Sequence, residues 1–144
     1  MLLNSWVLST GEKIGSKILS KIFWPPCSAM TLVIDDGRIL TVRTGNYLML
    51  PGGIMEPGEN FEDTAVRETR EETGLRVEIL QEIESDVKSF GGVEKIFLAE
   101  VAGGELEGSW EGQPEWVSLE EVSEEEWRWN RDIESLVEKA ESKQ

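Results

Sequence analysis

The segment Gly53–Leu75 reads GIMEPGENFEDTAVRETREETGL, and it joins a glycine-containing turn to a strongly patterned helix. Asn60 is expected to cap the start of this helix, with Asp63 three residues on in the capping-box position. The helix should run to Thr73 and end at Gly74, because glycine favours the left-handed conformation found after helix C-termini. The segment therefore predicts a helix with a defined start and a defined end.

Three acidic side chains, those of Glu68, Glu71 and Glu72, share one face of this helix because they stand at i, i+3 and i+4. Like charges at these spacings repel each other and reduce helix stability. Such a face is either a solvated acidic surface or a set of hard oxygen ligands for Mg²⁺ or Mn²⁺. The preceding turns Gly52-Gly53 and Pro57-Gly58 favour a ligand site, because they let the backbone approach a ligand and fold the loop back onto the helix.

The segment resembles the signature of the Nudix hydrolase family, G-x5-E-x7-R-E-U-x-E-E-x-G-U, in which U is apolar. Every fixed position matches, and the mild departure is Thr69 at an apolar position. A pattern of this length is far more specific than a short glycine motif. The resemblance continues outside the signature and covers about residues 28–140, through a first hairpin at 30–43, Leu50–Gly53 and Trp116–Leu119.

The resemblance implies a metal site made by the helix carboxylates and one backbone carbonyl. Its ligands would be Glu68, Glu71, Glu72 and Gly53. Arg67 would orient the carboxylates and fix the loop on the helix, and Glu59 would be structural or a ligand through water. The cofactor would be Mg²⁺, with Mn²⁺ as a substitute, and Glu68 or Glu71 would take a proton from water.

A glutamate outside the signature is another catalytic or metal-binding candidate. The run Glu111–Pro114 resembles the loop that supplies such a glutamate in MutT-type members of the family. Glu111 is alternatively one more loop acid in a very acidic chain. The sequence leaves both interpretations of Glu111 open.

Substrate contacts are expected from four residues outside the signature: Arg43, Tyr47, Leu50 and Asn130. Arg43 would contact phosphate or base, and Tyr47 and Leu50 would line the pocket. Asn130 stands where MutT-type triphosphatases use an asparagine to read a guanine edge, or it is a solvated helix residue. The tryptophan usual in the family near Tyr47 is absent, which weakens the expectation of base stacking there.

The implied activity is Mg²⁺-dependent hydrolysis of the pyrophosphate bond in a nucleoside diphosphate linked to another moiety. A (d)NTP is the first expectation, because of Glu111 and Asn130, and ADP-ribose or a nucleotide sugar is the alternative. A Nudix module that senses a nucleotide without cutting it agrees less well with three retained helix glutamates. An acidic interaction protein with a coincidental motif would gain no stability from Mg²⁺ plus nucleotide.

The composition limits the classes of partner and ligand that the chain can bind. Its 144 residues suit one domain, and 29 acidic against 14 basic residues give a net charge of −15. General attraction to a nucleic acid polymer is therefore excluded, and a small phosphate substrate needs a cation beside it. With no histidine, carboxylates must act as ligands and base. The single Cys27 favours a reducing, cytoplasmic compartment.

The expected fold is α+β: a Nudix-type α/β/α sandwich with a mixed β-sheet, plus an extra N-terminal helix. Residues 1–24 form an amphipathic helical extension and residues 25–144 the Nudix domain. The extension is expected to pack on its own domain, with a membrane surface or a homodimer contact as alternatives, and no run reaches the ~20 apolar residues that span a bilayer. Strands are expected at 30–34, 38–43, 47–50, 75–80, 87–90, 93–101 and 115–118, and a helix at 124–140 opened by a Ser123/Glu126 capping box.

Overall fold

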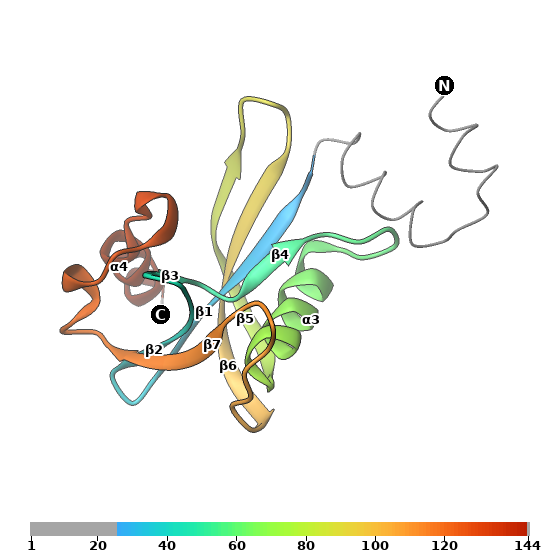
Figure 1. Ribbon diagram of the computed structural model, residues 1–144. Helices are drawn as coiled ribbons and strands as arrows, with labels where there is room; N and C mark the ends of the chain where they lie inside the picture. Colours follow the sequence, from blue (N-terminus) through green and yellow to red (C-terminus); the bar gives the residue numbers. More distant parts are fainter. Residues whose placement is uncertain (1–25, 144) are drawn as a thin grey trace, which may run out of the picture.

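The computed structural model describes residues 26–143 and places a mixed β-sheet between two helices (Figure 1). The elements are β1 (Ser28–Asp35), β2 (Arg38–Thr44), β3 (Tyr47–Met49), β4 (Gly52–Ile54), α3 (Phe61–Thr73), β5 (Leu75–Val87), β6 (Val93–Gly104), β7 (Gln113–Ser118), the 3₁₀ turns η1 (Val122–Glu124) and η2 (Arg128–Asn130), and α4 (Ile133–Lys143). The predicted α+β sandwich is confirmed, whereas the helix expected over 1–24 lies outside the described residues.

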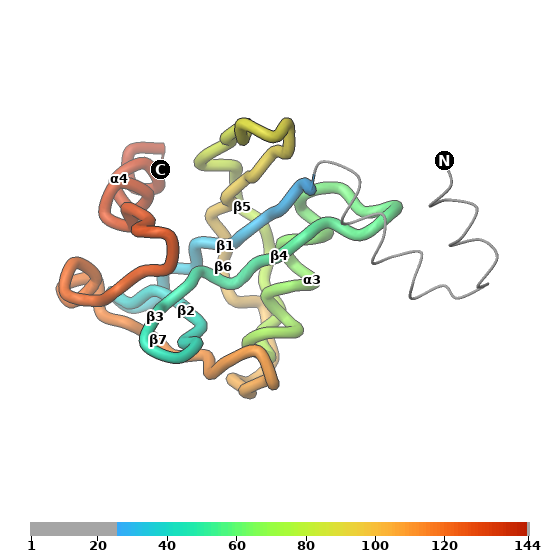
Figure 2. Tube along the Cα trace, turned by 45° about the horizontal axis from the view of Figure 1, so that its top comes forward, coloured from blue at the N-terminus to red at the C-terminus, as the bar shows by residue number. Residues whose placement is uncertain are grey.

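The strand β1 lies at the centre of the sheet. It pairs in parallel with β6 and antiparallel with β2 and β4. The strands β5 and β6 form a long antiparallel hairpin beside it, and β7 pairs antiparallel with β2. Figure 2 shows α3 and α4 on opposite sides of these strands. Among residues 26–143, no helix is both long and apolar enough to cross a membrane.

Side chains of β1 enter two cores, because successive residues of a strand point to opposite faces. Met30 and Leu32 pack with Leu136 of α4 in the first core. Val33 packs with Val77 of β5 in a second core on the α3 side. Burial on both faces explains why this strand is a nearly continuous apolar run.

The polar residue Thr69, which departs from the family signature, is fully buried where α3 meets β1. Its hydroxyl lies 2.8 Å from the hydroxyl of Thr31 and donates to the carbonyl of Ala65 at 2.7 Å. A buried hydroxyl is tolerated when its hydrogen bonds are made inside the protein. The departure therefore leaves α3 firmly attached to the central strand.

The prediction of a helix over 124–140 is wrong for its first half, because α4 begins only at Ile133. The chain forms η1 and η2 before α4, and η1 has no side-chain cap. Trp127 is buried and its indole N–H donates to the Val122 carbonyl at 2.9 Å. Trp129 and Asn130 then adopt positive φ angles of 60° and 52°, which interrupt a right-handed helix. The Asp132 side chain instead accepts from the Ser135 N–H at the start of α4.

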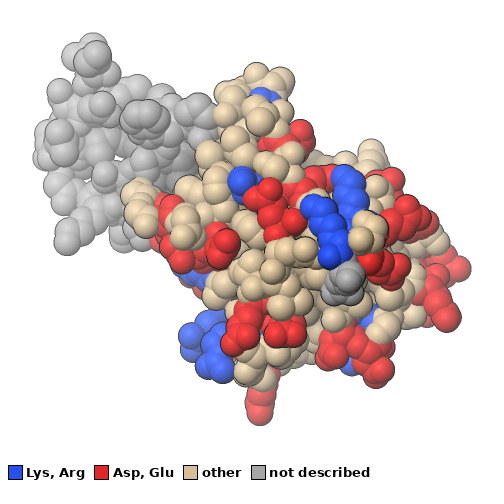
Figure 3. Space-filling view, turned by 180° about the vertical axis from the view of Figure 1, so that it is seen from behind, with Lys and Arg blue, Asp and Glu red and all other residues tan. Residues whose placement is uncertain are grey.

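The strand β5 is longer than the strand expected over 75–80 and continues without a break to Val87. Its second half is rich in acidic residues, which have low strand propensity and conceal the strand in the sequence. Pairing with neighbours compensates, since Glu82 binds Lys95 of β6 at 2.7 Å and Glu84 binds Lys139 of α4 at 2.6 Å. The strand expected at 87–90 is absent beyond Val87, because the hairpin turn begins there. In the view from behind, acidic side chains form separate groups among basic and other residues (Figure 3).

Candidate active site

Helix α3 and the loop before β7 bring three carboxylates together. One oxygen each from Glu68, Glu72 and Glu111 lies within 4.8 Å of the others. Glu68 and Glu72 stand one turn apart on α3 and are 9% and 4% exposed, whereas Glu111 is exposed. The Thr44 hydroxyl of β2 donates to the Glu111 carbonyl at 2.9 Å and holds its loop in place. We call Glu68, Glu72 and Glu111 the carboxylate cluster.

Two glycines of β4 allow the backbone to lie directly against this cluster. A Cβ atom on Gly53 would lie 2.5 Å from the carboxylate carbon of Glu68, so no larger residue fits there without a shift. The N–H of Gly52 donates to Oε2 of Glu72 at 3.3 Å. The glycine turn and the acidic helix therefore form one site.

Burial is the main reason why the pKa values of Glu68 and Glu72 are raised. For Glu72 the negative charge of Glu68 is the next cause, and together they raise its pKa to about 9. For Glu68 the nearby charge of Arg67 works against the effect of burial. Ionised carboxylates so placed need a positive partner, and an oxygen-only donor set suits a hard divalent cation. The residues present therefore fit the divalent metal ion that the family resemblance implies.

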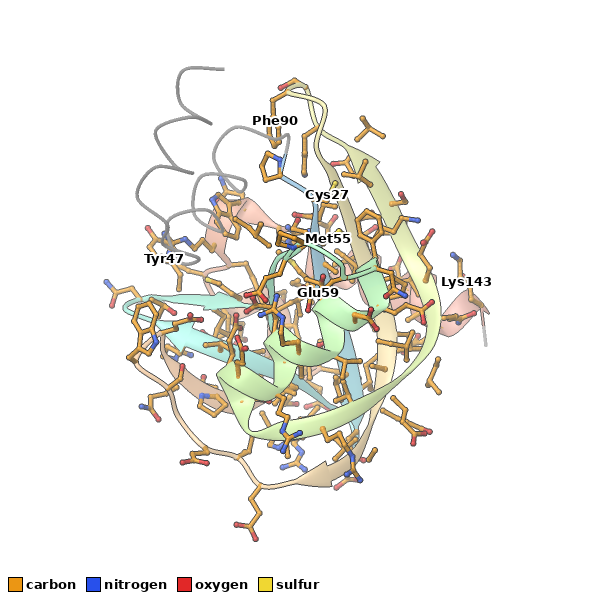
Figure 4. The ribbon with its side chains drawn as sticks, turned by 90° about the vertical axis from the view of Figure 1, so that its right-hand side faces the viewer. Cys27, Tyr47, Met55, Glu59, Phe90 and Lys143 are labelled. Carbon is orange, nitrogen blue, oxygen red and sulfur yellow. The ribbon has the colours of Figure 1, made fainter. Side chains whose placement is uncertain are left out.

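Arg67 ties the loop before α3 to the carboxylates. Its Nε and Nη2 donate to the two oxygens of Glu59 at 2.7 and 3.0 Å. Its Nη1 donates to Glu68 at 2.9 Å and to Glu71 at 3.1 Å, and Nη2 also reaches the Ile54 carbonyl at 3.2 Å. Arg67 is thereby in a position to orient Glu68 and to fix the loop. Figure 4 shows Glu59 in this loop, next to the start of α3.

Replacing Glu59 with Gln is expected to lower the free energy of unfolding by about 2–3 kcal/mol, somewhat below the cost of breaking a fully buried ion pair. Arg67 is the main cause that lowers the pKa of Glu59 to about 2, and the two side chains are only 22% and 16% exposed. Urea unfolding near neutral pH measures the effect. Glu62→Gln on the exposed face of α3 is the matched control, and equal urea midpoints for the two variants would contradict the prediction.

Glu71 lies beside the carboxylate cluster and not within it. Its side chain is 57% exposed and forms an ion pair with Arg67 at 3.1 Å. Position 71 lies on the flank of α3, while positions 68 and 72 face β4 because one helical turn separates them. The structure therefore brings two of the three glutamates that the signature places on α3 together with Glu111.

A cavity of about 500 Å³ lies between β3 and the segment that leads into α4, and we call it the side cavity. Two predicted substrate contacts, Tyr47 and Asn130, line it together with Trp127. The Tyr47 side chain is 47% exposed and so can be reached from solvent. In Figure 4, Tyr47 lies well apart from Glu59.

The other two predicted substrate contacts are placed differently. Arg43 donates to Glu115 at 2.7 Å and to Glu125 at 3.3 Å, so its charge is already paired, and these carboxylates raise its pKa. Leu50 is 2% exposed and belongs to the core on the α4 side. It is therefore a packing residue and offers no surface to a substrate. An apolar residue beside a glycine turn gives no sequence signal that separates these two roles.

Two neighbouring residues of β2 connect the carboxylate cluster to the side cavity. Thr44 holds the Glu111 loop, and Arg43 contacts Glu125, which lines the cavity. One strand therefore contributes residues to both regions. The sequence did not single out Glu125, because it stands in the acidic run 124–126 with nothing to distinguish it from a surface residue.

Comparison with known proteins identifies the family. The model of the NUDIX domain matches residues 25–138. A MutT-like protein of Streptomyces ambofaciens is 37% identical over 101 residues, which are 67% of this chain and 65% of that protein. An ADP-ribose pyrophosphatase of Methanocaldococcus jannaschii is 35% identical over 114 residues, with coverages of 67% and 68%. The chain thus spans about two thirds of the length of these relatives.

A solved structure supports the same fold assignment. The NUDIX hydrolase from Nitrosomonas europaea superposes with a TM-score of 0.70 at 20% identity, over 82% of this chain and 89% of that one. The family model covers most of the chain, and the glycine turn meets the acidic helix where the family signature places them. This chain therefore belongs to the Nudix hydrolase family.

Proposed function

We propose that the protein hydrolyses the pyrophosphate bond of a (d)NTP with Mg²⁺ held by the carboxylate cluster. The observation that carries this proposal is the approach of Glu68, Glu72 and Glu111 oxygens to within 4.8 Å of one another beside a glycine turn. Mg²⁺ supplies charge neutralisation of the phosphates and activation of a water molecule near neutral pH. Without a cation, a chain of net charge −15 would repel the same phosphates.

The residues of the site divide the remaining tasks. Glu68 and Glu72 are buried and would hold the cation together with Glu111, and Arg67 orients Glu68 through its 2.9 Å hydrogen bond. Glu71 is exposed and lies outside the cluster, so it can exchange protons with solvent and would take the proton of the attacking water; exposed Glu111 is the alternative base if it does not bind the cation. The glycine turn lets the backbone of β4 lie directly against the Glu68 carboxylate, because no side chain stands between them.

The nucleoside is proposed to occupy the side cavity while the phosphates stay at the cluster. The cavity contains Glu125 and Glu126, and its Arg131 is paired with Glu94 at 2.9 Å. An acidic wall disfavours phosphate but accepts the amino groups of a base. A volume of about 500 Å³ is suitable for a ligand of this size. Tyr47 offers a stacking surface and Asn130 an amide for the base edge.

ADP-ribose is the second candidate substrate, because one relative is named an ADP-ribose pyrophosphatase. A panel of dNTPs, ADP-ribose, nucleotide sugars and dinucleoside polyphosphates, assayed for phosphate and pyrophosphate with and without Mg²⁺, tests both. Pyrophosphate release from a dNTP supports the first candidate. Thermal stabilisation by nucleotide without any turnover would instead support a sensing module. The absence of both turnover and stabilisation would contradict the proposal. A cytoplasmic location and a homodimer stay predictions from the sequence.

Replacing Tyr47 with Ala is expected to raise KM for the best nucleotide about tenfold with little change in kcat, because stacking on an aromatic ring contributes about 1–3 kcal/mol per base. The side chain is half exposed, so the substitution should leave the fold intact. Steady-state kinetics measure the effect. Tyr47→Phe keeps the ring and serves as the control, with KM near wild type. An unchanged KM in the Ala variant would remove Tyr47 from the proposed site.

A further inference from the structure

Arg131 lines the side cavity, and its guanidinium forms an ion pair with a residue of β6. Nη2 of Arg131 lies 2.9 Å from Oε1 of Glu94 in β6, and the side chains are 17% and 11% exposed. Lys88 lies 3.8 Å from the same oxygen and binds Asp86 at 2.9 Å. The pair Arg131–Glu94 therefore links the segment before α4 to the β5–β6 hairpin and leaves Arg131 unavailable for a phosphate.

The two residues before Arg131 hold a strained backbone. Trp129 and Asn130 have φ angles of 60° and 52°, a left-handed conformation that is unfavourable for residues other than glycine. Such conformations persist only where the surroundings impose them. The chain ahead of them is anchored, since the N–H of Leu48 donates to the Glu126 carbonyl at 2.9 Å. The anchor behind them is the pair Arg131–Glu94.

The neighbours of Arg131 on both sides, Asn130 and Asp132, line the side cavity. Their positions depend on where the backbone of Arg131 is held, because consecutive residues are joined by rigid peptide units. We infer that Arg131 and Glu94 are positioning residues. Their ion pair fixes the part of the cavity wall formed by Asn130 and Asp132 and so determines which nucleosides fit into the cavity. This inference rests on the proposed function. The pair contacts neither the carboxylate cluster nor Arg67 and so acts on KM, not on kcat.

Glu94→Gln tests the inference, because it keeps the shape of the side chain and removes the charge. We expect KM for the best nucleotide of the panel to rise about five- to tenfold, as for weakening a charge-assisted hydrogen bond to a neutral one, with kcat within about twofold of wild type. Lys139→Met is the matched control, since it removes the 2.6 Å pair with Glu84 that ties α4 to β5. It should leave KM unchanged. Arg131→Lys retains a cation for Glu94, so its KM should stay much closer to the wild-type value than the KM of Glu94→Gln.

Hydrogen exchange of the Asn130 amide gives a second readout that requires no turnover. This N–H donates to the Trp127 carbonyl at 3.1 Å. Exchange should be faster in Glu94→Gln than in Lys139→Met. Equal changes in the two variants, in KM or in exchange, would overturn the inference, as would a loss of kcat in Glu94→Gln. If no nucleotide is hydrolysed, the proposed function fails, while the exchange measurement still decides whether the pair holds Asn130.

Discussion

Glu72→Gln should abolish Mg²⁺-dependent hydrolysis and at the same time make the metal-free protein more stable. Glu72 is 4% exposed, and burial together with the charge of Glu68 raises its pKa. Gln has the same shape but no charge to desolvate, so the fold gains stability. Without the carboxylate the cation loses a ligand, and kcat/KM should fall on the order of a thousandfold, comparable with losing a major electrostatic contact to the transition state.

Two measurements on one preparation test this opposite pair of effects. Turnover is followed while Mg²⁺ is titrated, and thermal unfolding is followed in a chelator. Glu62→Gln is the control, because Glu62 stands on the exposed face of α3 and takes no part in the carboxylate cluster. Wild-type turnover in Glu72→Gln would remove the cluster from the mechanism. A lower melting temperature than wild type in the chelator would show that Glu72 is structural even without metal.

The half of the site that lies on α3 could be predicted from the sequence because its geometry is local. The helix period places Glu68 and Glu72 on one side, and Asn60 and Gly74 define the ends of the helix, as the caps in the structure show. What local spacing did not reveal is which glutamate faces β4. That depends on how α3 packs on the sheet, and the packing leaves Glu71 on the exposed flank.

The half of the site made by the C-terminal segment could not be read from local patterns. Ser123 and Glu126 have the spacing of a capping box, but burial of Trp127 overrides it and the helix begins at Ile133. Contacts between residues far apart in the chain are hidden in the same way. Arg131 meets Glu94 across the fold, and each residue alone resembles one of many surface charges.

The metal-free protein should lose stability as the pH rises from about 5 to about 8, and Mg²⁺ should largely remove this loss. In the unfolded chain Glu72 releases its proton near the ordinary value of 4.5, whereas in the folded protein its pKa is raised to about 9. Between these values the folded state binds more protons than the unfolded state, so the free energy of unfolding falls with pH, by up to about 1.4 kcal/mol per pH unit for one group.

Glu72 and Glu59 affect stability in different pH ranges, because their pKa values are shifted in opposite directions. The pKa of Glu59 is lowered to about 2, so its contribution to stability is lost only as the pH falls from 4.5 toward that value. Urea unfolding at about pH 5 and about pH 8, each in chelator and in Mg²⁺, therefore reports mainly on the buried carboxylates. General repulsion among acidic groups gives a slope of the same sign, and Glu72→Gln removes only the part due to the cluster. If the variant and the wild type show equal slopes in chelator, the buried pair is not the source, and a cation would have no charge there to neutralise.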